Sequence, residues 1–339
     1  MTLADTAKAL AADDKGLLAM DESNATCNKR FAALGIPQTE EVRRQWRELL
    51  LSTPGLAQSI SGVILYDETL FQTDRHGALF LDVIAASGMI AGIKVDAGKV
   101  PLPNTDPPES VTQGLDGLAR RLATYRGMGL RFAKWRAVFS IGEGQPSPRA
   151  IAANAHALAR YAALCQTAGL VPIIEPEVLM TGSHPLEACA QATEAVLRAT
   201  FAQCYSQGVR LEEMVLKVAM VLPGQLCPIQ PDPPTIAQAT LATLRRSVPS
   251  AIPAVLFLSG GQSAELASAR LNAIHLAAGR QIPTPLSFSF ARAIQQPALE
   301  LWRGDDRHVG AAQAAIAHRA QCNRAARRGD YLAAMEQAS

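Results

Sequence analysis

Short apolar stretches alternate with longer amphipathic ones along nearly the whole chain. The short stretches are rich in β-branched and other apolar residues and have the length of buried strands. Eight of them occur, at residues 16–21, 62–66, 91–96, 131–136, 171–179, 214–220, 254–260 and 285–290. Between them, apolar residues recur every three or four positions, which predicts helices. Eight strand–helix repeats over about 300 residues predict a (β/α)8 barrel.

Helix ends and loops agree with this architecture. One helical stretch starts at Thr39, and two others end at Gly169 and Gly279, where glycine suits a left-handed C-cap. Two proline-rich stretches, 101–108 and 222–234, follow the third and sixth strands. Because strand and helix patterns resume after each, we interpret them as loops on the active face, not as linkers. We therefore predict one catalytic domain over 1–339, with a short tail from about residue 331.

The alternative architecture is an open, doubly wound sheet with a nucleotide site. Such a fold usually carries a glycine-rich phosphate loop that opens its first helix. The nearest match, Gly142-Glu143-Gly144, lacks both the third glycine and a preceding strand. The barrel is therefore the favoured fold class.

The amino-acid composition disfavours several classes of protein. Of 339 residues, 48% are hydrophobic and 18% charged, below the roughly 25% charged residues of an average domain, which predicts a large buried core. The formal net charge is only +2, and no long run of one sign occurs, so a nucleic-acid partner is disfavoured. The six cysteines are scattered without a CxxC pair, as in a protein with reduced thiols.

The N-terminal stretch does not look like an export signal. Asp5, Asp13 and Asp14 interrupt the segment where a signal peptide needs an unbroken apolar core. No uninterrupted apolar run reaches the roughly 18 residues of a membrane span. We therefore expect a cytoplasmic protein without a membrane partner.

Charged residues lie inside four of the predicted strands, where a buried parallel sheet should be apolar. They are spaced by two and stand toward the C-terminal strand ends: Lys94 and Asp96, Lys134 and Arg136, Glu175 and Glu177, and the single Lys217. Each pair therefore shares one face of its strand, at the end where barrels build active sites. Ion-paired filling of the barrel mouth is the alternative, but buried ion pairs add little net stability, so four neighbouring strands together favour function.

Lys217 is the candidate nucleophile. It is flanked by apolar residues from Met214 to Met220, so its amine loses hydration, and repulsion from Lys134 would further favour the neutral form. A neutral lysine amine can form a Schiff base with a carbonyl substrate. Glu175 and Glu177 would supply the acid and base that dehydration of the carbinolamine needs.

An anion site is predicted at the end of the seventh strand. Residues 258–263, LSGGQS, combine two glycines with the start of a helix, and Arg292 follows the eighth strand. Backbone N–H groups at such turns bind phosphate, as loops after strands 7 and 8 of barrels often do. The six histidines show no HxH or HExxH spacing, and no GxSxG elbow occurs. We expect neither a metal nor another cofactor.

The motifs together resemble the class I fructose-1,6-bisphosphate aldolases over nearly the whole chain, to about residue 331. They occur in family order: DKGLLAMDES (14–23), GVILYDETLFQ (62–72), GIKVD (92–96), FAKWR (132–136), VPIIEPEVL (171–179), VLK (215–217), FLSGGQS (257–263) and LNAI (271–274). The resemblance implies that Lys217 forms the Schiff base and that Glu175 is the principal general acid and base. It also implies three orienting residues, namely Asp21, Glu177 and Lys134.

The same resemblance assigns the substrate's two phosphates. The carbon 1 phosphate would be held by Ser259, Gly260, Gly261, Ser289 and Arg292. Toward the carbon 6 phosphate would lie Arg30, Arg43 and Lys94, with Arg136 also among the substrate-binding residues.

The chain departs from the family pattern at three places. Val218 and Ala219 follow the lysine where KPNM is usual, and Ala291 replaces the glycine of SYGR, so the phosphate loop is expected to differ in detail. Well-studied animal members also use a terminal tyrosine for proton exchange on the enamine. Here we expect Tyr331 or a carboxylate to take that step, or the step to be slow.

The leading hypothesis is a metal-independent lyase that reversibly splits fructose 1,6-bisphosphate into dihydroxyacetone phosphate and glyceraldehyde 3-phosphate. One alternative keeps the chemistry but changes the phosphosugar, for example to sedoheptulose 1,7-bisphosphate or a monophosphate. Another is a scaffold barrel without catalysis, which the intact Lys217, Glu175 and Arg292 disfavour. The resemblance also implies a homo-oligomer, commonly a tetramer.

Overall fold

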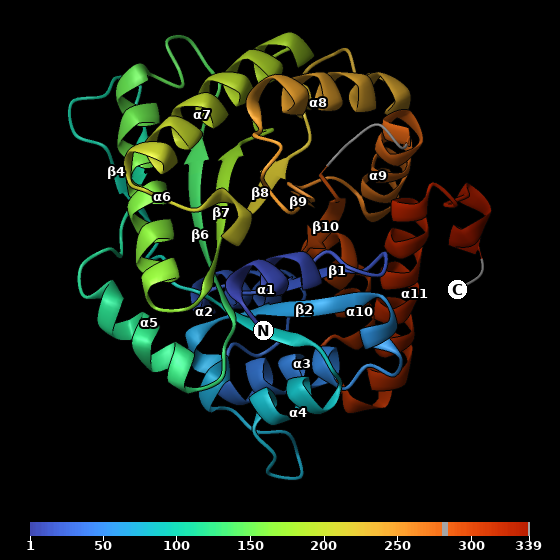
Figure 1. Cartoon of the computed structure of the whole chain (residues 1–339). Helices are drawn as coiled ribbons and strands as arrows, with labels where there is room; N and C mark the ends of the chain where they lie inside the picture. Colours follow the sequence, from blue (N-terminus) through green and yellow to red (C-terminus); the bar gives the residue numbers. More distant parts are fainter. Residues whose placement is uncertain (280–283, 338–339) are drawn as a thin grey trace.

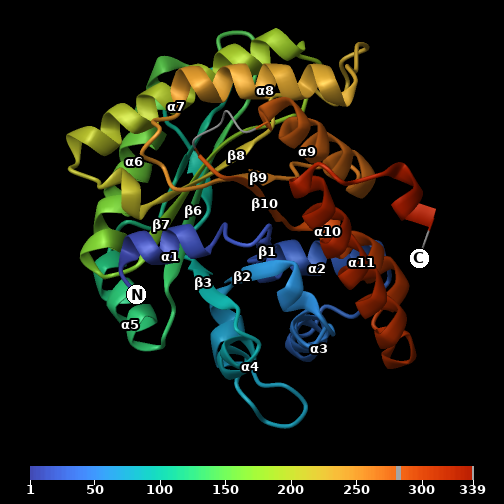
Figure 2. The same cartoon turned by 45° about the vertical axis from the view of Figure 1, so that its right-hand side comes forward.

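Eight parallel strands close into a barrel. The computed structural model describes residues 1–279 and 284–337. Around the barrel the strand order is β1-β10-β9-β8-β7-β6-β3-β2, with helices outside (Figures 1 and 2). The strands are β1 Gly16–Met20, β2 Ile60–Leu65, β3 Ile90–Lys94, β6 Phe132–Phe139, β7 Val171–Val178, β8 Val215–Ala219, β9 Val255–Leu258 and β10 Leu286–Phe290. All eight predicted strands, and with them the (β/α)8 fold, are confirmed.

Several of the helices begin at a residue whose side chain caps the first turn. Thr39, Ser147 and Ser263 each accept a hydrogen bond from a backbone N–H three residues on, at the starts of α3, α6 and α9. No helix in the described part of the chain is both long and apolar enough to cross a membrane. The helices are α1 Leu3–Ala9, α2 Asn24–Ala33, α3 Glu40–Leu51, α4 Phe80–Ala86, α5 Leu118–Gly127, α6 Pro148–Thr167, α7 Leu186–Ser206, α8 Pro233–Ser247, α9 Ala264–Ala278, α10 Arg292–Trp302 and α11 Val309–Arg328.

The two faces of the strands bury different cores. Outward residues such as Trp135 and Phe257 pack beneath the helices in the larger core. Inward residues near the strand starts, such as Phe132 and Leu256, form a second core together with Leu10 beside α1. Helix α1 crosses this end of the barrel (Figures 1 and 2). The N-terminal end is thereby filled with apolar side chains, and the inward charges of the strands gather at the other end.

The first proline-rich stretch is more ordered than expected. Residues on either side of it pair as a small antiparallel hairpin, β4 Lys99–Pro101 with β5 Ser110–Thr112. Asn154 of α6 anchors the hairpin, because its side chain donates to Ser110 O at 2.9 Å and accepts from Thr112 N at 3.3 Å. The stretch at 222–234 contains no strand, and α8 starts only at Pro233, so the second loop is confirmed.

We predict that Gly92→Ala lowers the free energy of unfolding by about 1–3 kcal/mol, the usual cost of overpacking a core. A Cβ at Gly92 would lie 2.1 Å from the ring of Phe132, which is fully buried. Urea unfolding measures the effect. Gly127→Ala is the control, because nothing lies within 4 Å of that Cβ and alanine is the better helix former. Equal stability of the two variants would contradict the packing argument.

Candidate active site

A cleft of about 810 Å³ opens at the C-terminal ends of the barrel strands. Most of the predicted site residues line it: Asp21, Arg30, Lys94, Lys134, Arg136, Glu175, Glu177, Lys217, Ser259, Gly260, Ser289 and Arg292. The strands deliver them because inward positions recur every second residue. The paired charges predicted to share strand faces therefore do converge on one mouth of the barrel.

Four buried side chains in this cleft form a chain of alternating charge. Lys134 Nζ lies 2.8 Å from Asp21 Oδ2 and 2.6 Å from Glu175 Oε2. The other oxygen of Glu175 lies 2.9 Å from Lys217 Nζ. Each of the four side chains is less than 10% exposed. Glu175 is thus held between two ammonium groups, in contact with the candidate nucleophile.

The pKa shifts in this chain follow from its alternating charges. Burial opposes ionisation of Asp21, but Lys134 and the other lysines outweigh it and lower the pKa of its carboxyl to about 2. Burial also opposes ionisation of Glu175, and Lys134 and Lys217 again lower the pKa. For Lys134, the two carboxylates overcome burial and raise the pKa. Lys134 therefore stays an ammonium, and Glu175 is ionised and able to accept a proton.

The structure adds a partner to the expectation about Lys217. The sequence argument considered loss of hydration and added repulsion from Lys134, without a carboxylate between the two lysines. Two carboxylates already pair with Lys134, and Glu175 stands against both lysines. The nearest charged partner of Lys217 is therefore a proton acceptor, and Lys134 acts chiefly on the carboxylates.

A second set of charges lies nearer the cleft entrance. Arg136 Nε donates to Glu177 Oε2 at 2.5 Å, and Lys94 Nζ lies 2.7 Å from Asp96 Oδ1. Two further lysines that the sequence reasoning missed also line the cleft, Lys29 of α2 and Lys99 of β4. Lys29 directly precedes Arg30 in the sequence, and this adjacency to a predicted phosphate-binding residue could have identified Lys29. This side of the cleft is rich in cations.

The cleft also contains the predicted anion site. Ser259, Gly260, Ser289 and Arg292 line the cleft at the ends of β9 and β10. The hydroxyl of Ser289 is buried without a hydrogen-bond partner in the described residues, so it is available to a ligand. Gly261 does not line the cleft. Its φ of 91° lies in the left-handed region that favours glycine, and a Cβ there would lie 3.2 Å from Gln225 Nε2, so Gly261 shapes the turn.

Arg43 and Tyr331 are not in the cleft. Arg43 donates to both oxygens of Glu68, at 2.9 and 2.6 Å, and to Asn28 at 3.0 Å, so its guanidinium is already committed. In this arrangement Arg43 supports α2 through Asn28, and its role at the carbon 6 phosphate stays a prediction. Tyr331 Oη donates to Glu336 Oε1 at 2.7 Å, outside the cleft, which favours a carboxylate for the enamine proton.

One group of potential metal ligands occurs in the described residues. His318, Cys322 and Glu336 bring their donor atoms within 4.8 Å of one another, but none lines the cleft. Arg319 already forms an ion pair with Glu336 at this place. The cluster therefore has no part in the chemistry of the barrel mouth.

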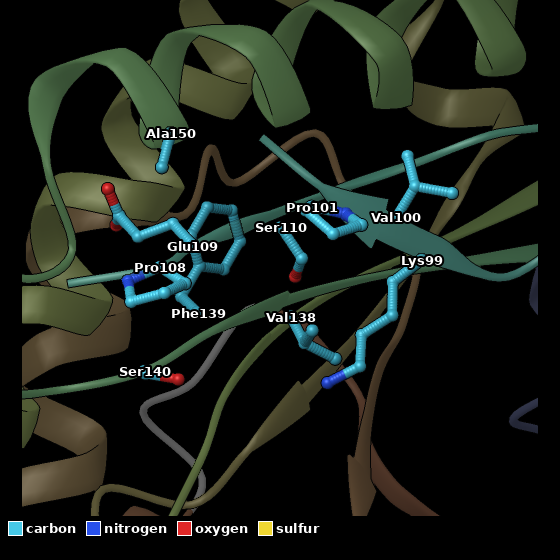
Figure 3. Close-up of a pocket in the computed structure, with 10 residues that line it drawn as sticks. All are labelled: Lys99, Val100, Pro101, Pro108, Glu109, Ser110, Val138, Phe139, Ser140 and Ala150. Carbon is cyan, nitrogen blue, oxygen red and sulfur yellow. The ribbon is translucent and has the colours of Figure 1, made fainter. Parts of the chain in front are cut away.

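A smaller cavity of about 240 Å³ lies behind the β4–β5 hairpin (Figure 3). Lys99 and Val138 line both this cavity and the cleft. Glu109, whose carboxylate lines the smaller cavity, accepts a hydrogen bond from Ser147 N at 2.8 Å. This bond holds the hairpin to the start of α6. The cavity contains no lysine–carboxylate pair like that of the cleft.

Known proteins are similar to this chain in sequence and in fold. A family model described as fructose-bisphosphate aldolase class-I matches residues 2–339. The chain belongs to the class I fructose-bisphosphate aldolase family. A "probable fructose-bisphosphate aldolase class 1" of Xanthomonas axonopodis pv. citri is 50% identical to it over 330 residues, 97% of this chain and 98% of the relative. A chloroplastic fructose-bisphosphate aldolase 1 of Chlamydomonas reinhardtii is 48% identical over 98% of this chain and 87% of the relative.

A solved structure agrees over nearly the whole length. It is the fructose-bisphosphate aldolase of Plasmodium falciparum, in complex with TRAP and a small-molecule inhibitor. Its TM-score to this chain is 0.95 at 44% identity, and the match covers 97% of this chain and 95% of the other. The aldolase barrel predicted from the sequence is therefore confirmed.

We predict that Asp21→Asn destabilises this aldolase-family protein by about 2 kcal/mol at pH 7, the linkage free energy of a carboxyl whose pKa falls from 3.8 to about 2. A lowered pKa stabilises the fold above the unfolded value and loses that effect as the pH falls toward the folded value. The deficit should therefore shrink below pH 5 and reach about half by pH 3. Urea unfolding at several pH values measures it, with exposed Asp116→Asn as the control. A deficit independent of pH would contradict the ion-pair explanation.

Proposed function

We propose that the protein is a class I aldolase that reversibly cleaves fructose 1,6-bisphosphate into dihydroxyacetone phosphate and glyceraldehyde 3-phosphate. The observation that carries the proposal is the contact between Lys217 Nζ and Glu175 Oε1 at 2.9 Å, inside a cleft with cationic groups toward both ends. A bis-phosphorylated keto sugar has a carbonyl group that the lysine amine can attack. It also has a phosphate at each end that cationic groups of the cleft can bind. Membership of the aldolase family supports the same reaction.

The first half of the mechanism forms the Schiff base. Glu175 accepts a proton from Lys217, and the neutral amine attacks the carbonyl carbon 2. The resulting carbinolamine must lose its hydroxyl as water, and Glu175 can return the proton for that step. The product is an iminium at carbon 2, an electron sink adjacent to the bond that breaks.

Cleavage follows from this sink. A carboxylate removes the proton of the carbon 4 hydroxyl, the bond between carbons 3 and 4 breaks, and its electron pair moves into the iminium to give an enamine. Glyceraldehyde 3-phosphate leaves as the aldehyde. Protonation at carbon 3 and hydrolysis of the iminium then release dihydroxyacetone phosphate and restore Lys217. Glu175 is the nearest carboxylate to the nitrogen, so we assign it the principal acid–base role.

The neighbours of Glu175 keep it ready for these transfers. Lys134 favours the ionised carboxylate, and Asp21 balances the charge of that lysine at 2.8 Å. Both act as orienting groups in the proposal. Glu177 holds Arg136 near the cleft entrance, where the guanidinium faces the arriving phosphosugar.

The two phosphates would occupy opposite ends of the cleft. At the carbon 1 end we place Ser259, Gly260, Ser289 and Arg292, with Gly261 behind them. Toward carbon 6 we place the cationic side, with Arg30, Lys94, Arg136 and the additional Lys29 and Lys99. Charge-assisted hydrogen bonds to both ends would position the carbonyl over Lys217.

We also propose that the whole chain is one catalytic domain that acts in the cytoplasm as a homo-oligomer, with no cofactor. The family resemblance supports the oligomer, commonly a tetramer. Light scattering of the purified protein determines the assembly, and a monomer at working concentration would contradict it. Cell fractionation determines the location.

We predict that Lys217→Arg lowers the rate of fructose 1,6-bisphosphate cleavage by about 10⁴-fold or more, because a guanidinium cannot form the Schiff base. A coupled assay of glyceraldehyde 3-phosphate measures the rate. Borohydride reduction with dihydroxyacetone phosphate should attach the substrate to Lys217 of the wild-type protein, as read by peptide mass. Circular dichroism checks that the variant remains folded.

Three outcomes would overturn the proposed function. They are an active Lys217→Arg variant, no adduct on Lys217, and complete loss of activity in EDTA. Turnover on fructose 1,6-bisphosphate, sedoheptulose 1,7-bisphosphate and the monophosphates, measured side by side, identifies the preferred sugar.

We predict that Glu175→Gln lowers kcat by about 10²- to 10⁴-fold, the usual contribution of a general acid–base group. The amide keeps the shape of the carboxylate but cannot accept a proton from Lys217. Borohydride trapping should slow together with cleavage, because both require the Schiff base. The control Glu109→Gln changes a carboxylate that lines only the smaller cavity. Trapping at the wild-type rate in Glu175→Gln would assign that proton transfer to another group.

A further inference from the structure

A buried arginine stands behind the phosphate loop with no acidic partner among the described residues. Arg270 of α9 is 5% exposed, yet no ion pair to it occurs within residues 1–279 and 284–337. Burial lowers the pKa of its guanidinium, and no carboxylate counters that effect. Its Nε is buried without a hydrogen-bond partner in the same described part of the chain. A buried, unpaired cation normally costs stability, so its presence needs an explanation.

The contacts of Arg270 lead toward the anion site. Its Nη1 donates to Gln262 Oε1 at 3.0 Å. The amide nitrogen of the same glutamine donates to Ser259 O at 3.0 Å, as does its backbone N–H. Ser259 begins the turn that lines the cleft, and Gln262 is itself buried. Two hydrogen bonds thus connect the guanidinium to the loop on which the carbon 1 phosphate would rest.

We propose that Arg270 is a positioning residue for the carbon 1 phosphate. Through Gln262 it holds the backbone of the phosphate loop in place. Its charge, which forms no ion pair within residues 1–279 and 284–337, adds to the positive potential that the phosphate meets. Charges interact strongly across a protein interior because water does not screen them there. The phosphate is therefore the counter-ion that Arg270 lacks. The inference rests on the proposed function and deepens it.

A role of Arg270 in stabilising the fold and its proposed role in binding phosphate predict opposite effects of replacing it. If Arg270 mainly stabilised the fold, its removal would lower the melting temperature and leave phosphate binding unchanged. In our proposal, the buried cation costs stability and is retained for the substrate. Its replacement by an apolar side chain of similar length should therefore weaken binding of phosphate without weakening the fold.

Arg270→Met tests the proposal. We expect KM for fructose 1,6-bisphosphate and the inhibition constant of inorganic phosphate to rise by about 5- to 20-fold, because one weakly screened positive charge and one support of the loop are lost. The turnover number should remain within about twofold, and without phosphate the melting temperature should remain within about 2 °C of the wild type. Arg270→Lys, which keeps the charge, should recover part of the lost affinity.

A ketone without a phosphate distinguishes an effect on the phosphate loop from an effect on Schiff-base formation. Borohydride trapping of dihydroxyacetone should be equal in Arg270→Met and the wild type, whereas trapping of dihydroxyacetone phosphate at low concentration should fall. Arg319→Met is the matched control, because it removes a buried guanidinium from the adjacent α11 that is paired with Glu336. We expect it to leave KM unchanged.

The possible failures are distinguishable. If the wild-type protein neither cleaves the bisphosphate nor forms an adduct, the proposed function is wrong. If it does both, then an unchanged KM in Arg270→Met, a clearly lower melting temperature, or an equal loss of trapping with both ketones overturns the role of Arg270.

Discussion

The ammonium of Lys134, held between two buried carboxylates, is the interaction on which the site depends. Without it, Asp21 would lose its ion-pair partner and Glu175 would keep only Lys217, so protonation of both buried carboxyls would become easier. A protonated Glu175 could not accept a proton from Lys217. Burial of any one of these charged groups alone would be unfavourable. Their mutual ion pairs are what allow all four to be buried in the charged state. The proposed reactivity of the Lys217 amine therefore depends on four side chains, which lie on or directly after four different strands.

The barrel makes such a set possible by separating its two ends. Inward positions near the strand starts are apolar and pack with residues beside α1, whereas the same face of the same strands carries charges two or four residues later. Phe132 and Lys134 illustrate the change on β6. The apolar end supplies rigidity and excludes water from below. The polar end then requires no large movement to bring its groups into contact.

The sequence predicted the barrel and most of the cleft because both depend on local periodicity. A charge at every second position of an apolar strand can be read without knowing its partners. Partners across strands cannot be read in this way, which is why we missed the pairing of Lys134 with two carboxylates and of Arg43 with Glu68. The β4–β5 hairpin was missed because strands of three residues are too short for periodicity to be detected. Lys99, which the hairpin carries, was missed with it.

The hairpin and α2 contribute Lys99, Lys29 and Arg30 to the cationic side of the cleft, beside Lys94 and Arg136 of the barrel strands, while the charged chain and the anion turn belong to the barrel itself. In the proposed binding mode, the half of the sugar that keeps the Schiff base would meet strand ends fixed by the closed sheet. The half that leaves as an aldehyde would also meet the appended hairpin. Changes in the length or composition of residues 102–109 could accumulate without disturbing carbonyl chemistry. In the synthetic direction, such an enzyme would be strict about its ketone donor and permissive about its aldehyde acceptor, a useful asymmetry for redesign.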